Sequence, residues 1–548
     1  MSGSNHMFDV KRGVAALILA ALAACGGGGG PAGDPVFGGV SPGGGSSGGG
    51  SSGGGTTGSL SPDPAGPSAS FAQQCAANNT LAASNLRNST LDSEKKWLRA
   101  YFDEAYLWRD EVPRVDPNLA TYGGSDTAAA MDAYFEALKS PQLTDSGARR
   151  DRFSFTYPTE QWKALADNGV EAGYGAEWTL GSRPPPRRIR VAYVEAGSPA
   201  AAAGLQRGDE VISVDGTSAD ATDTAGVDRL NAGLYPSALG AAHTFVLQRS
   251  GAGNLTRSMT SASVSKTPVP IAQVVTTPQG TRAGYLLFND HTAPSEGQLI
   301  TAVRSFQSQG LRELVLDLRY NGGGYLYIAS ELATMIAGTT ATAGLPFESL
   351  RFNARRSSEN TTTPFYNQSC FLSGNNCTSV QPLPLMSLTR VYVLAQSGTC
   401  SASEAVINGL RGVGVNVVLI GGKTCGKPYG FTAKDNCGVS YFPIEFTGVN
   451  AKGFGEYSDG FEPTAGVDNA TRFVNGCSVA DDLSRPLGDT GEAMLASALG
   501  HLDSGRCPVL PTPSAGARAQ SATVGDGGAA PLLLNRHPAR SNRLLVGR

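Results

Sequence analysis

The chain has 548 residues, of which 43 are Lys or Arg and 46 are Asp or Glu, giving a formal net charge of -3. Its length predicts more than one domain, and its hydrophobic fraction of 40% is ample for globular folding. Charge so evenly balanced, without a basic stripe, argues against nucleic acid as a partner.

The first 24 residues predict a secretory signal. Lys11 and Arg12 precede an apolar run, residues 13–21, that is too short for a stable membrane anchor. The run leads into Leu22-Ala23-Ala24-Cys25, which resembles the lipobox of bacterial lipoproteins. That resemblance implies lipidation of Cys25, with plain secretion as the alternative. We therefore expect a lipid-anchored protein of the bacterial cell envelope that faces the periplasm, at the outer membrane rather than the inner one.

Residues 25–68 are mostly Gly, Ser, Thr and Pro and predict a flexible tether. Export to an oxidising compartment suggests disulfides among the eight cysteines that remain after Cys25. Sequence separation favours the pairs Cys370–Cys377, Cys425–Cys437 and Cys477–Cys507. Because no CxxC spacing is present and histidine is scarce, we predict no metal site, and nothing implies an organic cofactor.

Residues 69–165 predict an N-terminal helical domain. Between Glu94 and Asp110, apolar side chains recur at three- and four-residue spacing, which is typical of one buried helix face. These side chains are Trp97, Leu98, Tyr101, Phe102, Ala105 and Trp108.

Residues 166–265 change to short strands and turns. The predicted strand 189–194 is followed by GSPAAAAGLQRGDEVISVDG at 197–216, and this string resembles a PDZ domain. Upstream, Gly173-Tyr174-Gly175-Ala176 resembles the PDZ loop whose backbone amides hold the terminal carboxylate of a peptide. A plain turn is the alternative interpretation of these glycines.

Residues 266–507 alternate strands with helices, which predicts an α/β core with buried parallel strands. The expected strands are 284–288, 314–318, 391–394 and 415–420, and the expected helices are 295–309, 325–336 and 401–410. From residue 508 to 548 the composition predicts a disordered tail.

Two segments of this core combine a strand end, a turn of small residues and a helix start: DLRYNGGG at 317–324 and SGTCSASE at 397–404. The first turn of a helix has N–H groups without intrahelical partners, so Ser401 would lie beside donors that can stabilise an oxyanion. Glycine lets a second N–H group approach closely. A helix cap and an ordinary turn are the alternative interpretation.

A nucleophilic serine needs a base. Lys427 follows the apolar strand 415–420, and burial there would favour a neutral amine. His291 follows another core strand and stays an alternative, whereas His243 and His501 are poorly placed. Cys400 is a rival nucleophile, although an exported cysteine is more often bridged or inert.

Together these motifs resemble the carboxyl-terminal processing proteases, S41 serine peptidases with a PDZ domain and a Ser–Lys pair; the resemblance extends over residues 90–505. It implies a ClpP/crotonase-like α/β core with an inserted PDZ domain and an N-terminal helical domain. In this family's pattern Ser401 would be the nucleophile and Lys427 the base. An oxyanion hole would come from Ala402, Gly322 and Gly323, with Glu404 and Thr424 in support, Thr424 as a holder of the lysine amine.

The resemblance also implies cleavage of protein substrates near free carboxyl-terminal tails that the PDZ domain binds. A catalytically inactive peptide- or ligand-binding relative, and a scaffold lipoprotein, are the alternatives. Two departures stand out. The spacing from Ser401 to Lys427 is one residue longer than usual, and Gly412 and Phe431 occupy positions where relatives carry a polar third catalytic member. A simple dyad or a substitute such as Asn416 would follow.

Overall fold

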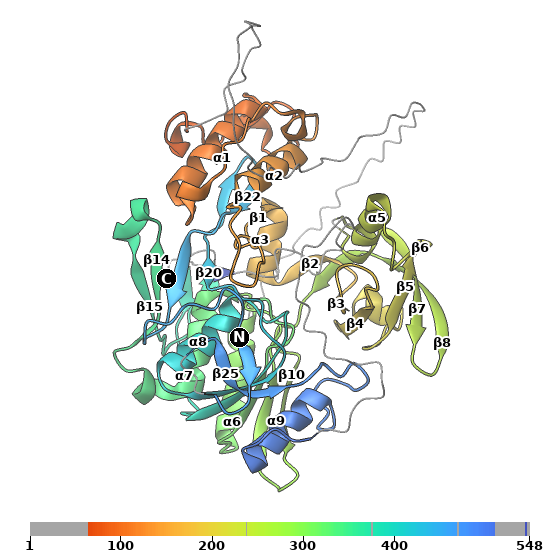
Figure 1. The fold of residues 1–548 in the computed structure, drawn as a ribbon, viewed down its shortest axis with the longest axis vertical. Coiled ribbons are helices and arrows are strands. Elements are labelled where there is room, and N and C mark those ends of the chain that lie inside the picture. The colour runs from red at the N-terminus through yellow and green to blue at the C-terminus, as the bar shows by residue number, and fades with distance from the viewer. Residues whose placement is uncertain (1–63, 237, 374–375, 468–470, 510–542, 545–548) are drawn as a thin grey trace, which may run out of the picture. The chain divides into compact units, whose positions relative to one another are not determined.

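The computed structural model describes residues 64–236, 238–373, 376–467, 471–509 and 543–544 (Figure 1). The predicted signal, Cys25, most of the predicted tether and most of the predicted tail lie outside these residues. Within the described ranges, no helix is both long enough and apolar enough to cross a bilayer.

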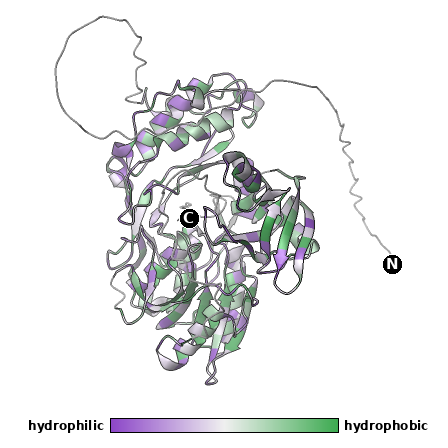
Figure 2. Ribbon diagram, turned by 45° about the vertical axis from the view of Figure 1, so that its right-hand side comes forward, coloured by the Kyte–Doolittle hydropathy of each residue, from purple (hydrophilic) through white to green (hydrophobic). Residues whose placement is uncertain are grey.

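A seven-stranded sheet forms the centre of the α/β core. Its order is β10 (Ile271–Thr276), β11 (Arg282–Leu287), β12 (Leu314–Asp317), β18 (Arg390–Ala395), β19 (Asn416–Gly421), β25 (Phe473–Ser478) and β24 (Glu462–Thr464). The strands from β11 to β24 are parallel, and β10 is an antiparallel edge. Figure 2 shows these strands as largely hydrophobic, which is typical of a parallel sheet covered on both faces.

Alternate side chains of the central strands pack on opposite faces of the sheet. On one face, Tyr392 and Ile420 belong to a cluster with α9 (Ala493–Ser504). On the other face, Val393 and Leu419 belong to the main cluster, which includes α6 (Ser295–Ser308), α7 (Leu326–Thr342) and α8 (Ala402–Gly412). The core strands and helices expected from the sequence are confirmed. The helix predicted to end at Ile336 breaks at Gly338, which has φ 78° and ψ 162°, and α7 continues beyond this break to Thr342.

The N-terminal region is helical, as expected, but it is built onto the core. It contains α1 (Leu91–Ala105), α2 (Thr127–Leu138), β1 (Phe155–Pro158) and α3 (Thr159–Asn168). Strand β1 pairs with β22 (Val439–Phe442), which pairs in turn with β21 (Lys434–Asn436). The apolar stripe ends with α1 at Ala105, and Trp108 lies beyond the helix, where its ring packs edge-on against Tyr429 with centroids 4.8 Å apart.

Smaller elements complete this body. A four-stranded sheet has the order β15 (Thr361–Pro364), β14 (Pro346–Phe352), β23 (Phe446–Val449) and β20 (Tyr429–Gly430). Strands β16 (Phe371–Ser373) and β17 (Asn376–Ser379) form one pair, and β13 (Gly324–Tyr325) and β26 (Arg543–Leu544) another. Short 3-10 turns are η1 (Ser68–Ser70), η2 (Ser84–Leu86), η3 (Arg109–Glu111), η4 (Ala120–Tyr122) and η5 (Ala354–Glu359).

The predicted PDZ region has a sheet and a hydrophobic cluster of its own. Its strands are β2 (Val170–Gly173), β3 (Ala176–Leu180), β4 (Ile189–Val194), β5 (Glu210–Val214), β6 (Thr217–Ser218), β7 (Ala242–Arg249), β8 (Gly253–Thr260) and β9 (Ala262–Ser265). Its helices are α4 (Pro199–Ala202) and α5 (Thr224–Leu234). Trp178 stacks on Phe245 within this cluster, which contains no residue of the α/β core.

Four disulfides join all eight cysteines of the described residues. Cys370–Cys377 and Cys477–Cys507 form as predicted, but the predicted pair Cys425–Cys437 is wrong. Cys425 is bridged to Cys400, and Cys437 to Cys75. The reason lies in the topology: Cys400 and Cys425 follow the carboxyl ends of the neighbouring parallel strands β18 and β19, whereas Cys437 faces the N-terminal region.

Candidate active site

The two motifs of the core meet at the carboxyl ends of the adjacent strands β12 and β18. The Asn321 carbonyl accepts hydrogen bonds from Cys400 N–H at 3.0 Å and from Ser403 Oγ at 3.1 Å. Thr399 Oγ1 donates to the Leu318 carbonyl at 2.8 Å. These bonds fix the glycine turn directly against the loop that carries Ser401.

Ser401 caps α8 in an unusual backbone conformation, with φ 62° and ψ -112°. A positive φ at a residue with a side chain costs about 1–3 kcal/mol and persists only where surrounding structure enforces it. Here Ser401 is fully buried, and its N–H donates to Glu404 Oε2 at 2.9 Å. Such strain, concentrated on one serine at a helix start, is typical of functional sites.

The Glu404 carboxylate joins the serine loop to the lysine loop. Besides the Ser401 N–H, it accepts hydrogen bonds from the N–H groups of Gly426 and Lys427, both at 2.8 Å. Thr424 Oγ1 donates to Glu404 Oε1 at 2.5 Å. Burial raises the pKa of Glu404, and these four donors oppose that shift. Glu404 thereby holds the backbone on both sides of the predicted Ser–Lys pair.

Thr424 supports the site through the turn that carries Lys427. Its hydroxyl proton goes to Glu404, and its oxygen accepts the Phe461 N–H at 2.7 Å. Thr424 therefore stabilises the turn that carries Lys427, and its predicted contact with the lysine amine stays a prediction.

Lys427 is fully buried among aromatic rings. Its Nζ lies 4.2 Å from the centroid of Phe431 and 5.4 Å from that of Phe153. Burial disfavours the ammonium form, whereas ring faces attract it. Phe431 thus packs on the amine at the position where relatives carry a polar third member, and Phe153 reaches it from the N-terminal region.

The other candidates for a third member lie elsewhere. Asn416 is exposed at the amino end of β19, while the motifs converge at the carboxyl ends of the parallel strands. Gly412 ends α8 against Asn450. Because a strand rises by about 3.3 Å per residue, the length of β19 alone separates Asn416 from the lysine loop. Neither position supplies a group to the site.

Only part of the predicted oxyanion hole offers available donors. The Gly323 N–H donates to Asn321 Oδ1 at 2.9 Å and is therefore occupied. The buried N–H groups of Gly322 and Ala402 donate to no hydrogen bond within the described part of the chain. Gly322 follows Asn321, and Ala402 follows Ser401, so these two amides flank the contact between the loops.

The histidines have other partners. His291 is buried beside the glycine turn, and its Nδ1 lies 3.0 Å from Asn321 Oδ1. His243 pairs with Asp215 in the PDZ region, and His501 lies in α9 next to Tyr392. The sulfurs of Cys400 and Cys425 lie near the Glu404 carboxylate, but their disulfide removes the thiolates that a metal would need.

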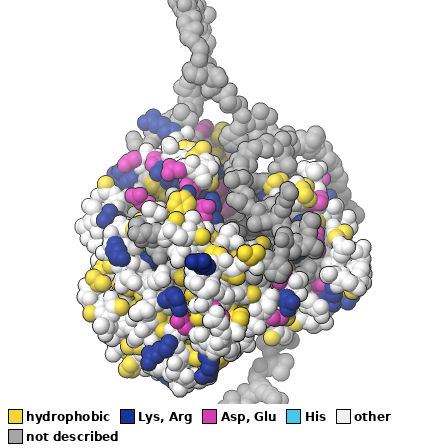
Figure 3. All heavy atoms as spheres, turned by 60° about the horizontal axis from the view of Figure 1, so that its bottom comes forward, with side chains coloured by type: hydrophobic (Ala, Val, Ile, Leu, Met, Phe, Trp, Pro, Cys, Tyr) yellow, Lys and Arg dark blue, Asp and Glu magenta, His cyan; other side chains and the backbone are white. Residues whose placement is uncertain are grey.

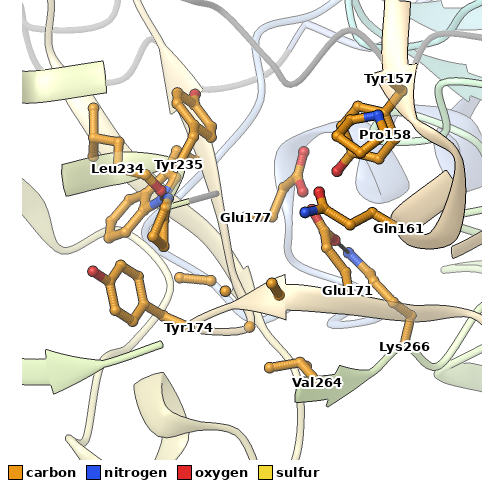
Figure 4. A pocket seen from close by; sticks show the side chains of 16 residues that line it. Tyr157, Pro158, Gln161, Glu171, Tyr174, Glu177, Leu234, Tyr235, Val264 and Lys266 are labelled. Carbon is orange, nitrogen blue, oxygen red and sulfur yellow. Dashed lines mark hydrogen bonds and ion pairs between the residues drawn. The ribbon is translucent and has the colours of Figure 1, made fainter. Parts of the chain in front are cut away.

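The predicted peptide loop borders a pocket of about 280 Å³ (Figure 4). All four predicted residues, Gly173 to Ala176, line it. Gly175 has φ +74°, and a Cβ there would overlap the Ser198 side chain, so only glycine fits. Other lining residues are Glu171, Glu177, Trp178, Leu234, Tyr235, Val264 and Lys266, together with Tyr157, Pro158 and Gln161 from the β1–α3 junction.

Three family models match the chain. Peptidase family S41 matches residues 282–434, the peptidase S41 N-terminal domain matches 93–155, and a PDZ domain matches 190–233. The first match includes both converging motifs and Lys427. The chain contains a peptidase family S41 domain together with an S41 N-terminal domain and a PDZ domain. Its α/β core, PDZ domain and N-terminal helical region share the architecture of S41 proteins.

Relatives agree with this assignment. A carboxyl-terminal-processing protease of Synechocystis is 27% identical over 271 residues, covering 48% of this chain and 54% of its own length. The processing protease CtpB of Bacillus subtilis is 32% identical over 142 residues, covering 25% and 27%. A Bacteroides fragilis crystal structure described as an S41 protease aligns with TM-score 0.53 and 25% identity, covering 75% of this chain and 97% of its own. The chain spans about half the length of this Synechocystis protein and of a carboxyl-terminal-processing protease of Picosynechococcus.

Sequence reasoning missed several residues at the S41 site. Phe153 lies far from Lys427 in sequence, and no local pattern connects them. The bridge between Cys400 and Cys425 had a signal in the positions of these cysteines beside the two motifs, but the shorter spacing to Cys437 obscured it. The contact of His291 with Asn321 depends on how the chain turns after β11, and the sequence alone does not show this turn.

Proposed function

We propose that this chain is an exported serine endopeptidase in which Ser401 is the nucleophile and Lys427 the general base. The observation that carries the proposal is the Glu404 carboxylate, which accepts hydrogen bonds from the backbones of both residues. The disulfide between Cys400 and Cys425 closes the same two loops covalently. A buried amine and a strained, buried serine at a helix start are the groups that a Ser–Lys pair requires.

In the proposed mechanism the neutral Lys427 amine takes the Ser401 proton as Oγ attacks the scissile carbonyl. The Gly322 and Ala402 N–H groups would donate to the developing oxyanion. The lysine ammonium then returns its proton to the leaving amine, and an acyl-enzyme forms on Ser401. Water, deprotonated by Lys427, hydrolyses the ester and restores the free serine.

We further propose that the PDZ pocket binds the free carboxyl-terminal tail of a protein substrate. The Gly173–Ala176 loop would hold the carboxylate with its amides, and the tail would add to the edge of β3. In Figure 4 the apolar and aromatic side chains of Leu234, Tyr174 and Tyr235 lie on one side of the pocket, and polar side chains including Glu177 and Gln161 lie on the other. An apolar last residue fits the first side.

Digestion of an unfolded test protein with an apolar tail examines this activity. The matched variants are Ser401→Ala and Lys427→Met, which keep size while they remove the hydroxyl and the amine. We expect both to lower kcat by about 10⁴-fold or more, since the members of a catalytic unit act together. Turnover by Ser401→Ala at the wild-type rate would show that Ser401 is not the nucleophile. Tail binding without turnover by the wild type would instead indicate the inactive peptide-binding relative.

The cellular place of the protein is a separate proposal, supported by the N-terminal sequence motif alone. We propose a lipid anchor on Cys25 that holds the domains in the periplasm, at the outer membrane. Fractionation after growth with a labelled fatty acid should place the label on wild type and not on Cys25→Ser. Label on the Cys25→Ser protein, or none on either, would contradict the anchor.

The surface of the described residues is mixed in charge. On the face drawn in Figure 3, Lys and Arg side chains lie singly or in small groups among uncharged and acidic ones. The described part of this face shows no long basic track, and we assign substrate selection to the pocket rather than to long-range attraction.

A further inference from the structure

His291 holds the glycine turn of the S41 site through its backbone. It lies between β11 and α6 and is fully buried. Its N–H donates to the Gly323 carbonyl at 3.0 Å, and its carbonyl accepts the Tyr325 N–H at 2.9 Å. A Cβ on Gly324 would overlap the His291 backbone, so the two segments are in direct contact. The His291 backbone is therefore hydrogen-bonded to the residues on both sides of Gly324, at the end of the GGG motif.

The side chain of His291 contacts the same turn. Its Nδ1 lies 3.0 Å from Asn321 Oδ1, which also accepts the Gly323 N–H at 2.9 Å. Asn321 Nδ2 donates to the Phe288 carbonyl at 3.0 Å, and this bond fixes which end of the amide faces the histidine. Since Oδ1 can only accept, Nδ1 must carry the proton that joins the pair.

Asn321 connects this pair to the nucleophile. Its backbone carbonyl accepts hydrogen bonds from Cys400 N–H and Ser403 Oγ, which flank the pair Ser401–Ala402. Asn321 thus has every polar group of its side chain and its carbonyl engaged. Next to it, the buried N–H of Gly322 has no hydrogen-bond partner among the described residues.

We propose that His291 is a positioning residue, which acts through Asn321 to hold the Gly322 N–H in place as an oxyanion donor. This inference rests on the proposed peptidase function. It also assigns the histidine a role other than that of the base. Its Nδ1–H is engaged with Asn321, and its ring packs against Phe288 with centroids 4.4 Å apart. The buried Nε2 has no hydrogen-bond partner among the described residues, so the variants below test whether this nitrogen transfers a proton. Burial lowers the pKa of His291 to about 3, which keeps the ring neutral near pH 7 and makes it a weak base.

Two substitutions distinguish a positioning histidine from a proton-transferring one. His291→Leu removes the donor to Asn321, whereas the side-chain amide of His291→Asn can still donate to it. We expect His291→Leu to lower kcat by about 100-fold with KM little changed, as loss of an oxyanion donor does. His291→Asn should recover most of this loss. His501→Leu, a change of another buried histidine, should leave kcat within about twofold of wild type.

Loss of activity in His291→Asn as complete as in Ser401→Ala would overturn the inference, because it would make the imidazole a participant in proton transfer. Unchanged kcat in His291→Leu would overturn it as well. Amide hydrogen exchange at Gly323 gives a readout independent of turnover. Protection of this amide should fall in His291→Leu and be retained in His291→Asn. Equal protection in both variants would contradict the positioning role of His291. An inactive wild type that shows the expected exchange would reject the proposed function alone.

Discussion

The S41 site and the PDZ pocket differ in how closely protein groups fill them. At the first, one buried carboxylate accepts four hydrogen bonds from the serine and lysine loops, and a disulfide joins these loops. The second encloses a space of about 280 Å³, beside which the Lys266 amine lies 3.7 Å from a Glu195 oxygen and 3.8 Å from a Glu171 oxygen. The first arrangement suits pre-organised chemistry, and the second offers room for a ligand. Changes to the first should therefore lower kcat, and changes to the second should raise KM.

Among changes that keep the Ser401 and Lys427 side chains, the largest effect should come from Glu404→Gln. One of the two carboxylate oxygens becomes an NH₂ group, which then faces N–H donors instead of accepting from them. We expect kcat to fall by about 10³-fold and the free energy of unfolding by about 3 kcal/mol.

Glu94→Gln is the matched control for this change. Glu94 is a buried carboxylate of the N-terminal region that accepts the Ala76 N–H at 2.7 Å. It should lose stability with kcat nearly unchanged. Equal loss of kcat in both variants, measured by steady-state kinetics, would mean that stability alone explains the result.

The next effect concerns the disulfide beside the nucleophile. Cys400→Ser/Cys425→Ser should lower kcat by about 100-fold, because the serine and lysine loops lose their covalent link and small displacements are costly at a reacting site. Cys370→Ser/Cys377→Ser opens the local bridge near β16 and β17 and should keep kcat near wild type. If the first variant were fully active, Glu404 alone would suffice to align the loops.

A smaller effect is expected in the pH dependence of stability. Burial lowers the pKa of His291 from 6.5 to about 3, and hydrogen bonds at Asn321 and Gly323 offset part of the shift. The unfolded chain therefore takes up a proton at higher pH than the folded one does. The stability that this histidine contributes is complete above pH 6.5 and is lost as the pH falls towards 3.

Between pH 7 and pH 5 this loss should amount to about 2 kcal/mol. Urea unfolding of wild type and His291→Asn at both pH values measures it, since the variant lacks the titrating group. The free energy of unfolding of the variant should change less over this interval. Identical pH dependence of the two proteins would show that His291 is not the group responsible.

The smallest of these effects is on binding. Gly175→Ala should raise KM about tenfold, or 1.4 kcal/mol, for a peptide with a free carboxylate, because the added Cβ overlaps Ser198 and displaces the loop. Gly197→Ala is the control, since Gly197 has a similar φ of +72° but an open space around it. A peptide with an amidated carboxyl terminus should respond little to either change. A fall in kcat at constant KM would show that this loop affects catalysis rather than binding.

The sequence predicted the elements that have a strong local signal. Alternation of apolar strands with helices gave the central sheet, and the glycine and serine motifs were found at strand ends. The predicted domain boundary at residue 165 does not separate two hydrophobic cores. Phe155 stacks on Phe442, and Trp97 lies against Tyr441, so the N-terminal region and the core share one cluster. Aromatic residues in a sequence indicate burial, but they do not indicate which residues they pack against.

Local sequence patterns could not show which residues far apart in the chain pair with each other. Cys425 is nearer to Cys437 in sequence, yet the parallel order of β18 and β19 brings it to Cys400. The hydrogen bond from Thr424 to Glu404 likewise depends on the packing of α8 against the lysine loop, which no local pattern shows.

By itself, the sequence determined which kinds of groups the protein has: a serine at a helix start, a lysine after a buried strand, glycines where the backbone must turn sharply. These choices follow from local rules of backbone conformation and burial, which act over a few residues. The tertiary structure alone decided which groups share a hydrogen bond, because strand order brings distant segments together. It placed His291 on Asn321 and Phe153 beside Lys427, and it commits the Gly323 amide while leaving that of Gly322 available.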